Sequence, residues 1–355
     1  MQFISFVAVM ASALSSSAYR VPTSHRIDRS PTLANLPEAW DWRAVHGRNW
    51  LTPSWNQHVP AACGSCYIHS ALSAISDRMH IASGGNCALR QLSRQTFLNC
   101  GASKGYGHGC DGGDVYDVYG YMKEHGLPDD SCQAYTAADG KCDAMGMCMN
   151  CMEGDGASRC WPVRHYVNYK IQGYNKISVH ESEREAAVMS ELMTRGPVAC
   201  GMFTDDRFDY EYAGGVWNLE NSNGTNNHDV ELVGWGESQG VPYWTVRNSW
   251  GTFWGEEGFF RIKRGLKKGL VDGDCWFAVP EKNESARDSE IGSMFGIVQK
   301  SPRTSTFVHD ILPSRTGLYS TVEVALLAST AALCGGIVAT CVQQKRRRWE
   351  YGTIA

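Results

Sequence analysis

Fourteen cysteines in 355 residues are the strongest constraint on how this chain can fold. Twelve of them lie between Cys63 and Cys275, and the other two, Cys334 and Cys341, lie in an apolar run near the end of the chain. Cysteines at this density are typical of proteins that fold in an oxidising compartment, where disulfides persist. The distribution predicts a disulfide-bonded body outside the cytosol and a separate C-terminal tail.

The N-terminus resembles a secretory signal. Residues 3–14 are mainly apolar, and small residues follow up to Ala18, as in a signal peptide cleaved near that position. We therefore expect a signal peptide over 1–18, with a buried N-terminal helix as the alternative. The next stretch, 19–35, contains Pro22 and Pro31 and is too short for a domain, which predicts a short pro-segment.

The C-terminus has the pattern of a membrane anchor. The nineteen residues from Val324 to Val342 carry no charge, enough for a helix of about 28 Å. Four basic residues follow at 345–348, and basic clusters of this kind stay in the cytosol. We expect a transmembrane helix over 318–342, a cytosolic tail over 343–355 and a type I orientation, with a buried core helix as the alternative.

Other features of the ends point to the secretory route. Tyr351 to Ile354 resembles a tyrosine-based endosomal sorting signal, so a sorting adaptor is an expected partner, although chance explains a four-residue match equally well. Residues 281–317 are polar and predict a stalk. Sequons at Asn223 and Asn283 predict glycosylation. We expect a lysosomal, endosomal or cell-surface protein whose folded body is lumenal or extracellular.

The body, 36–280, has a helical half followed by a β half. A helix is predicted from Cys66, because apolar residues recur at three-four spacing before Gly84 and Gly85 end it. Later runs at 230–233, 243–247 and 258–262 are β-branched or aromatic with glycines between them, which predicts strands. With 33 Lys and Arg against 37 Asp and Glu, no basic surface indicates a nucleic-acid partner.

Three residues form a pattern typical of nucleophilic catalysis. A cysteine in the first turn of a helix faces free backbone N–H groups and the positive end of the helix dipole, so Cys66 is placed to be a nucleophile. His228 is the candidate base, and Asn248 can orient its imidazole. The alternative is a structural or zinc-binding use of the CxxC pairs that begin at Cys63 and Cys148, but their separation is wrong for a zinc module. We expect neither a metal nor a cofactor.

At this point the sequence resembles the papain family of cysteine proteases. The matching motifs appear in the family's order: a glutamine before CGSCY at 63–67, NCG at 99–101, GCDGG at 109–113, NHDV at 227–230, GWG at 234–236 and RNSWG at 247–251. The resemblance implies an α+β fold with a helical N-terminal lobe, a β-barrel-like C-terminal lobe and a cleft between them. It also implies catalytic or oxyanion-binding roles for Cys66, His228, Asn248 and Gln57, and substrate-binding positions at His58, Gly112, Gly113, Asp229 and Trp250.

One insertion resembles the cathepsin X (cathepsin Z) branch of that family. Gln57 lies nine residues before Cys66 instead of the usual six, and the extra residues are His58, Val59 and Pro60. That branch carries a His-Ile-Pro triplet there and acts as a carboxypeptidase, so His58 is expected to bind the terminal carboxylate. The expected partners are peptides or proteins with a free C-terminus, and the expected state is a monomer. The alternatives are an endopeptidase or aminopeptidase on the same fold, and a surface binding protein without enzymatic activity.

The resemblance also implies a disulfide pattern. The pairs are Cys63 with Cys110, Cys100 with Cys132, and Cys200 with Cys275. Four further cysteines, expected to form two local bridges among three possible pairings, are Cys142, Cys148, Cys151 and Cys160. Cys87 is left without a partner.

Three positions depart from the family pattern. Tyr67 replaces the usual tryptophan after the nucleophile. Asp229 and Glu231 stand where the family has small or apolar residues, and Asp229 is expected to favour a basic residue at P2, the second residue before the scissile bond. No cysteine precedes Leu36, so the pro-segment cannot cap the nucleophile with a thiol as it does in the cathepsin X branch.

Overall fold

The structure is a computed structural model that describes residues 33–154, 157–219, 225–265 and 273–281. Outside these ranges lie the expected signal peptide, residues 19–32 of the pro-segment, all but the first residue of the stalk, the expected membrane span, the cytosolic tail and both sequons. Over the described ranges, no helix is long and apolar enough to cross a bilayer.

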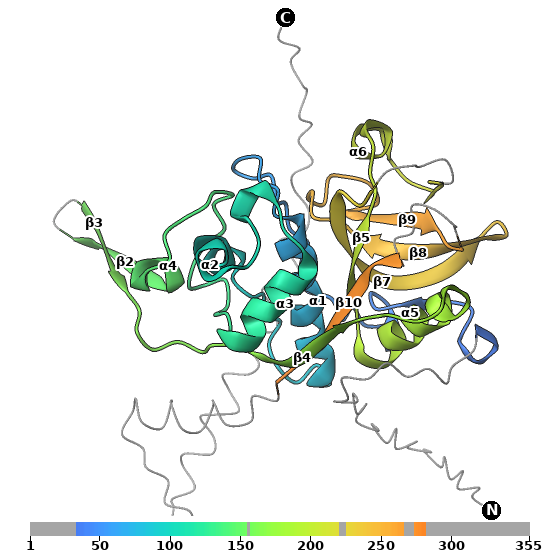
Figure 1. The fold of residues 1–355 in the computed structure, drawn as a ribbon, viewed down its shortest axis with the longest axis horizontal. Helices are drawn as coiled ribbons and strands as arrows, with labels where there is room; N and C mark the ends of the chain where they lie inside the picture. Colours follow the sequence, from blue (N-terminus) through green and yellow to red (C-terminus); the bar gives the residue numbers. More distant parts are fainter. Residues whose placement is uncertain (1–32, 155–156, 220–224, 266–272, 282–355) are drawn as a thin grey trace, which may run out of the picture. The chain divides into compact units, whose positions relative to one another are not determined.

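The first lobe is built from helices and contains one hairpin (Figure 1). Its hydrophobic core is separate from that of the second lobe. A disulfide-linked pair of strands extends from it, β2 (Met149–Gly154) and β3 (Ala157–Pro162). Its helices are α1 (Cys66–Ala82), α2 (Arg94–Cys100), α3 (Val115–Glu124) and α4 (Ala144–Met147), with 3-10 turns η3 (Ala102–Lys104) and η4 (Gly109–Asp111).

The second lobe is mainly β structure, which confirms the expected change of character along the chain. Eight strands of the described ranges form one sheet in the order β4-β10-β5-β7-β8-β9-β6, with β1 paired to β7. The strands are β1 (Trp40–Asp41), β4 (Ile171–Lys176), β5 (Val198–Met202), β6 (Val216–Trp217), β7 (His228–Ser238), β8 (Val241–Arg247), β9 (Phe259–Lys263) and β10 (Cys275–Pro280). The lobe's helical segments are η1 (Leu33–Asn35), η2 (Val45–Gly47), α5 (Glu181–Arg195) and α6 (Asp206–Glu211).

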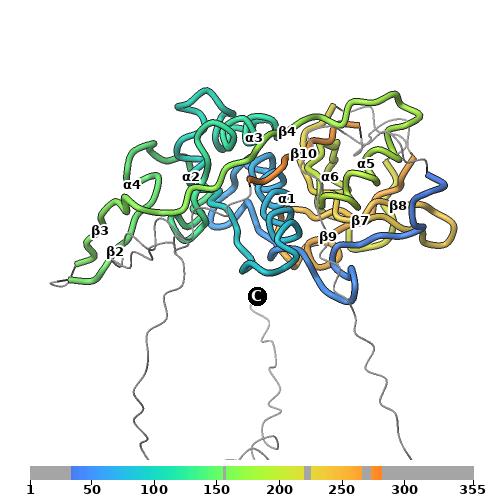
Figure 2. Tube along the Cα trace, turned by 90° about the horizontal axis from the view of Figure 1, so that it is seen from below, coloured from blue at the N-terminus to red at the C-terminus, as the bar shows by residue number. Residues whose placement is uncertain are grey.

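Helix α1 lies between the two lobes, as Figures 1 and 2 both show. Its apolar positions, including Ile68, Leu72 and Ile75, belong to the core of the helical lobe. The helix ends at Ala82, before two glycines with positive φ, as the sequence predicted. Its other face packs against β7, β5 and β10 of the second lobe. The first residue of this helix, Cys66, is therefore held at the junction of the lobes.

The face of α1 that meets the sheet carries buried charges as well as apolar side chains. Arg247 of β8 contacts Asp77 of α1 and Glu231 of β7, each at 2.5 Å, and all three side chains are buried. Thr52 donates two hydrogen bonds of 2.7 Å to Asp77. Burial and the nearby Asp77 raise the pKa of Glu231. Removing one partner of such a cluster typically costs about 3–5 kcal/mol, because a buried charge is left unpaired.

Five disulfides join described cysteines, and they correct the expected pattern. Cys63–Cys110 and Cys200–Cys275 are present, and Cys87 is free. The expected Cys100–Cys132 bridge is wrong, and only one of the two local bridges expected among the four later cysteines, Cys151–Cys160, is present. The other two pairs are Cys100–Cys142 and Cys132–Cys148.

Cys100 pairs with Cys142 rather than with Cys132 because of the way the loop before α4 packs on α2. Gln95 and Asn99 of α2 donate 2.8 Å hydrogen bonds to the carbonyls of Ala138 and Gly146. This packing places Cys142 beside Cys100, with 4.5 Å between their Cα atoms. The backbone N–H of Met149 meanwhile donates to the carbonyl of Cys132, so Cys148 is the cysteine beside Cys132.

Candidate active site

Cys66 is the first residue of α1, and its thiol is half-buried. The segment before it is fixed by the Cys63–Cys110 disulfide and by a 2.8 Å hydrogen bond from Gly64 N–H to the Cys110 carbonyl. A Cβ on Gly64 would lie 2.6 Å from that carbonyl oxygen, so only glycine allows this approach. The backbone N–H groups of Asp229, Tyr67 and Cys66 itself lower the pKa of this thiol, although burial raises it more. Asp229 is the residue after His228, so Cys66 lies beside the start of the strand that carries the expected base.

His228 begins β7, is buried, and is held by Asn248 from the end of β8. Its Nε2 lies 2.8 Å from Asn248 Oδ1. The backbone N–H of Ser249 donates to the same Oδ1 at 2.8 Å. A backbone N–H can only donate, so this atom must be the amide oxygen, and His228 Nε2 must carry a proton. The Trp250 ring lies over the imidazole, with 4.7 Å between ring centroids. The remaining nitrogen, Nδ1, is therefore the one that can exchange a proton.

Gln57 is buried and held from both lobes. Its Nε2 donates to the Cys63 carbonyl at 2.9 Å, which uses one of its two protons. Its Oε1 accepts from the Ser249 hydroxyl at 2.6 Å, and its backbone N–H donates to the Ser249 carbonyl at 2.7 Å. The second Nε2 proton is available to a reacting oxygen. Sequence reasoning missed Ser249 as the residue that orients this glutamine, because the two are 192 positions apart.

The inserted residues form an exposed loop beside this glutamine. The Gln57–Cys63 hydrogen bond closes the base of the loop, while His58, Val59 and Pro60 are exposed. His58 Nδ1 accepts from the Cys63 backbone N–H at 3.4 Å, so its Nε2 carries the proton in the neutral form. Desolvation lowers the pKa of His58 below 6.5. Burial is the main cause of the lowered pKa of His228, and the positive charge that His58 can carry adds to this effect.

The two glycines expected to bind substrate have different surroundings. Gly112 has φ of +108°, and a Cβ there would meet nothing within 4 Å, so the space beside it is open. Gly113 lies against the Tyr67 ring, where a Cβ would come within 2.6 Å of a ring carbon. The Tyr67 hydroxyl donates to the Gly109 carbonyl at 3.0 Å. Gly112 can therefore border a bound chain, while Gly113 packs on the tyrosine that replaces the family's usual tryptophan.

The electrostatics of the site favour uncharged forms before substrate binds. Burial raises the pKa of Cys66 to about 12, and the Asp229 carboxylate adds to the rise, although backbone N–H groups oppose it. Burial lowers the pKa of His228 to about 4, against the opposing effect of the Asn248 hydrogen bond. Burial therefore opposes a charge on either group taken alone, whereas a thiolate and an imidazolium side by side would stabilise each other. A thiolate then arises by proton transfer to His228, which is general-base activation of the nucleophile.

Asp229 is an acidic group placed next to the nucleophile. Burial, with smaller contributions from Asp114 and Asp274, raises the pKa of its carboxyl to about 8. The carboxyl lies near Gly201 of β5, where a Cβ would be 3.4 Å from Oδ1. A cation placed beside this carboxyl would favour its ionised form, since opposite charges stabilise each other at short range.

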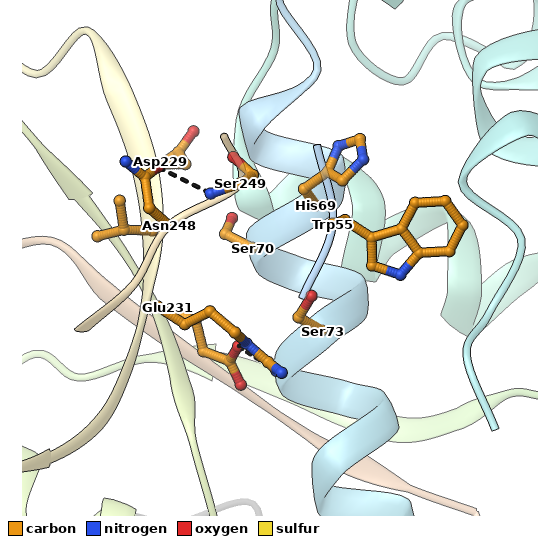
Figure 3. A pocket seen from close by; sticks show the side chains of 10 residues that line it. Trp55, His69, Ser70, Ser73, Asp229, Glu231, Asn248 and Ser249 are labelled. Carbon is orange, nitrogen blue, oxygen red and sulfur yellow. Dashed lines mark hydrogen bonds and ion pairs between the residues drawn. The ribbon is translucent and has the colours of Figure 1, made fainter. Parts of the chain in front are cut away.

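A small polar cavity lies behind the site, between α1 and the strands. Figure 3 shows Ser70 and Ser73 of α1 on one side and Asp229 and Glu231 of β7 on the other. Its volume is about 10 Å³, room for about one water molecule. It is too small for a substrate side chain. No group of three His, Cys, Asp or Glu within the described ranges could hold a metal ion.

Comparison with known proteins agrees with this geometry. A model of the papain family of cysteine proteases matches residues 36–278. The chain is 37% identical to cathepsin Z of Onchocerca volvulus over 259 residues, which cover 69% of this chain and 78% of that protein. It is 33% identical to cathepsin B-like cysteine proteinase 6 of Caenorhabditis elegans over 241 residues, or 63% of this chain and 62% of that protein.

A solved structure supports the same assignment. Procathepsin B S9 from Trypanosoma congolense superimposes with a TM-score of 0.57 at 25% identity, over 75% of this chain and 84% of that chain. The matched family region contains the Cys66, His228, Asn248 and Gln57 arrangement. The chain belongs to the papain family of cysteine proteases.

Proposed function

We propose that the chain is a cysteine carboxypeptidase that removes single residues from the C-termini of peptides. The observation that carries this proposal is the exposed His58 loop, closed at its base by the Gln57–Cys63 hydrogen bond. Because Gln57 is the expected oxyanion donor, the loop stands on the leaving-group side of the scissile bond. A loop there obstructs a longer chain and offers an imidazole to a terminal carboxylate.

The acylation step uses Cys66 and His228. The Cys66 thiol gives its proton to His228 Nδ1 as the sulfur bonds to the last peptide carbonyl carbon, and the carbonyl π electrons move to oxygen. The Cys66 backbone N–H and the free Nε2 proton of Gln57 stabilise that oxyanion. The C–N bond then breaks, and the imidazolium protonates the departing amino acid. The products are a free amino acid and a thioester on Cys66.

The deacylation step reverses the roles of the same two residues. His228 Nδ1 takes a proton from water as its oxygen bonds to the thioester carbon. The C–S bond breaks, the shortened peptide leaves as a carboxylic acid, and the sulfur regains a proton from the imidazolium. Asn248 accepts from His228 Nε2 throughout, which keeps Nδ1 in position and stabilises the imidazolium. Trp250, whose ring lies over the imidazole, would shield this hydrogen bond from water.

The ends of the chain support a membrane-anchored protein of the secretory route. The five disulfides of the body fit an oxidising compartment. We therefore keep the signal peptide, the glycosylated sequons, the span over 318–342 and the adaptor-binding tail as parts of the proposal. The catalytic body would face the lumen of a lysosome or endosome, or the cell exterior.

Anchoring is tested by extraction of membranes from cells that express the full chain. The full chain should remain in the membrane pellet at alkaline pH, and a variant ended after residue 317 should enter the supernatant. Recovery of the full chain in the supernatant would contradict the anchor.

The exopeptidase activity is tested with one peptide that has either a free or an amidated C-terminus. Stepwise loss of single residues is expected only from the free acid. His58→Ala should lower kcat/KM on the free acid about 10- to 100-fold, the usual range for a hydrogen bond to a charged group. Equal cleavage of the acid and the amide would refute the role of His58.

KM for the same free-acid peptide is expected to depend on pH. His58 has a pKa below 6.5, so it is charged only in acid and loses its charge as the pH rises. KM for the free-acid peptide should therefore increase with pH through this range. His58→Gln keeps an N–H donor but cannot be charged, so its KM should be insensitive to pH there.

Specificity at P2 tests the role of Asp229. Matched substrates with Arg or Leu at P2 should differ about tenfold in kcat/KM in favour of Arg, equivalent to about 1.4 kcal/mol. Asp229→Ala should remove the difference, while Asp206→Ala, an exposed acid on α6, should keep it. A preference for Leu that is unaltered in Asp229→Ala would rule out this role.

A further inference from the structure

Tyr135 lies in the loop between Cys132 and α4, next to the segment that carries Gln57. Its hydroxyl donates to the Gln57 backbone carbonyl at 2.8 Å and lies 2.7 Å from the Ser65 hydroxyl. Ser65 is the residue immediately before the candidate nucleophile. We propose that Tyr135 is a positioning residue that holds the two halves of the oxyanion site, Gln57 and the start of α1, in register. This inference rests on the function proposed above.

The direction of each hydrogen bond is fixed by the carbonyls at the ends. A carbonyl only accepts, so the Tyr135 proton goes to Gln57, and the Ser65 hydroxyl must then donate to Tyr135. His69 Nδ1 lies 2.9 Å from the Ser65 carbonyl, so it donates, and it is 3.3 Å from the Ser65 hydroxyl. The hydroxyl protons therefore point one way, from Ser65 to Tyr135 and from Tyr135 to Gln57, while His69 holds the Ser65 backbone carbonyl. Burial raises the pKa of Tyr135, which keeps its proton in place.

The loop that carries Tyr135 is itself fixed. The Cys132–Cys148 disulfide anchors it three residues before the tyrosine. Gln95 of α2 accepts from the Thr136 backbone N–H at 2.9 Å and donates to the Ala138 carbonyl at 2.8 Å. The Tyr135 ring stands edge-on to His69, with 4.9 Å between centroids. The hydroxyl thus comes from a rigid support, which a positioning group needs.

The position of the free Nε2 proton of Gln57 matters for catalysis, because this proton would stabilise the oxyanion. Ser249 holds the Gln57 side chain from the second lobe, while Tyr135 holds its backbone from the first lobe. If the Tyr135 bond is lost, the glutamine backbone is restrained from one side only. A small displacement of an oxyanion donor weakens transition-state binding much more than substrate binding.

The test compares Tyr135→Phe with Tyr119→Phe in the full chain. Both changes delete one hydroxyl and keep the ring. The hydroxyl of Tyr119 is buried and has no partner among the described residues, so its removal is a matched control. Four quantities are measured: kcat and KM on a free-acid peptide, the inhibition constant of a dipeptide aldehyde, and the rate of Cys66 alkylation by iodoacetamide. Ser65→Ala, which removes the donor to Tyr135, serves as a second variant.

The aldehyde and the alkylating agent separate the oxyanion site from the nucleophile. The aldehyde forms a hemithioacetal: the C–S bond forms, the carbonyl π bond breaks, and its oxygen takes the proton of the thiol. That oxygen occupies the oxyanion site. Iodoacetamide reacts by displacement of iodide and needs no oxyanion donor.

The expected result for Tyr135→Phe is a fall in kcat of about tenfold or more with KM within about twofold. The aldehyde's inhibition constant should rise by the same factor, and the alkylation rate should stay within about twofold. Ser65→Ala should show a smaller change in the same direction, and Tyr119→Phe none.

Two results would overturn this inference alone. One is a Tyr135→Phe enzyme with unchanged kcat and aldehyde inhibition, which would leave the proposed function standing. The other is an alkylation rate that falls in parallel with kcat, which would mean general disorder of the site. Wild-type protein that neither hydrolyses the peptide nor reacts at Cys66 would overturn this inference and the proposed function together.

Discussion

The buried ion pairs on helix α1 are the interactions on which the rest of the structure depends. One face of the helix belongs to the apolar core of the first lobe, but the opposite face carries charges that are fully enclosed. Asp77 pairs with Arg247 at 2.5 Å and Arg78 pairs with Glu191 at 2.8 Å, both across the junction. Sliding one lobe over the other would leave these charges buried and unpaired, at a cost of several kcal/mol. The two lobes are therefore locked in one arrangement.

This arrangement places the reacting groups. The N-terminus of α1 supplies Cys66, the start of β7 supplies His228, and the end of β8 supplies Asn248, so one rigid junction fixes all three. Burial of the junction raises the pKa of the Cys66 thiol and lowers that of the His228 imidazole. The donors that would stabilise the oxyanion, the Cys66 N–H and Gln57 Nε2, belong to the same junction. Catalysis then depends on donors that are preorganised at this junction.

The parts predicted from the sequence are those whose signal is local or lies in a distinctive motif. The three-four spacing of Ile68, Leu72 and Ile75 predicted helix α1. The motifs around Cys66 and His228, together with the chemistry of a thiol and an imidazole, predicted that these two residues act as a pair. The hairpin of β2 and β3 was missed, because its strands are exposed on both faces and show no apolar alternation.

Contacts between distant residues account for the remaining errors and omissions. The pairing of Cys100 with Cys142 depends on how a loop packs on Gln95 and Asn99 of α2, which no spacing rule reveals. Ser249 and Tyr135 were missed as partners of Gln57, since each contact joins segments far apart in the chain. A serine or a tyrosine carries no signal of its own for such a role.

The central claim is that Cys66 is a nucleophile activated by His228, and the most direct test compares the two free cysteines of the described ranges. Cys87 is half-buried and its thiol donates to the Ser83 hydroxyl, so it serves as an internal reference. Peptide mapping after brief iodoacetamide treatment should find Cys66 modified much faster than Cys87. His228→Ala should reduce the rate at Cys66 to about that of Cys87. Equal rates in the wild-type protein, or a Cys66 rate unchanged by His228→Ala, would contradict the account.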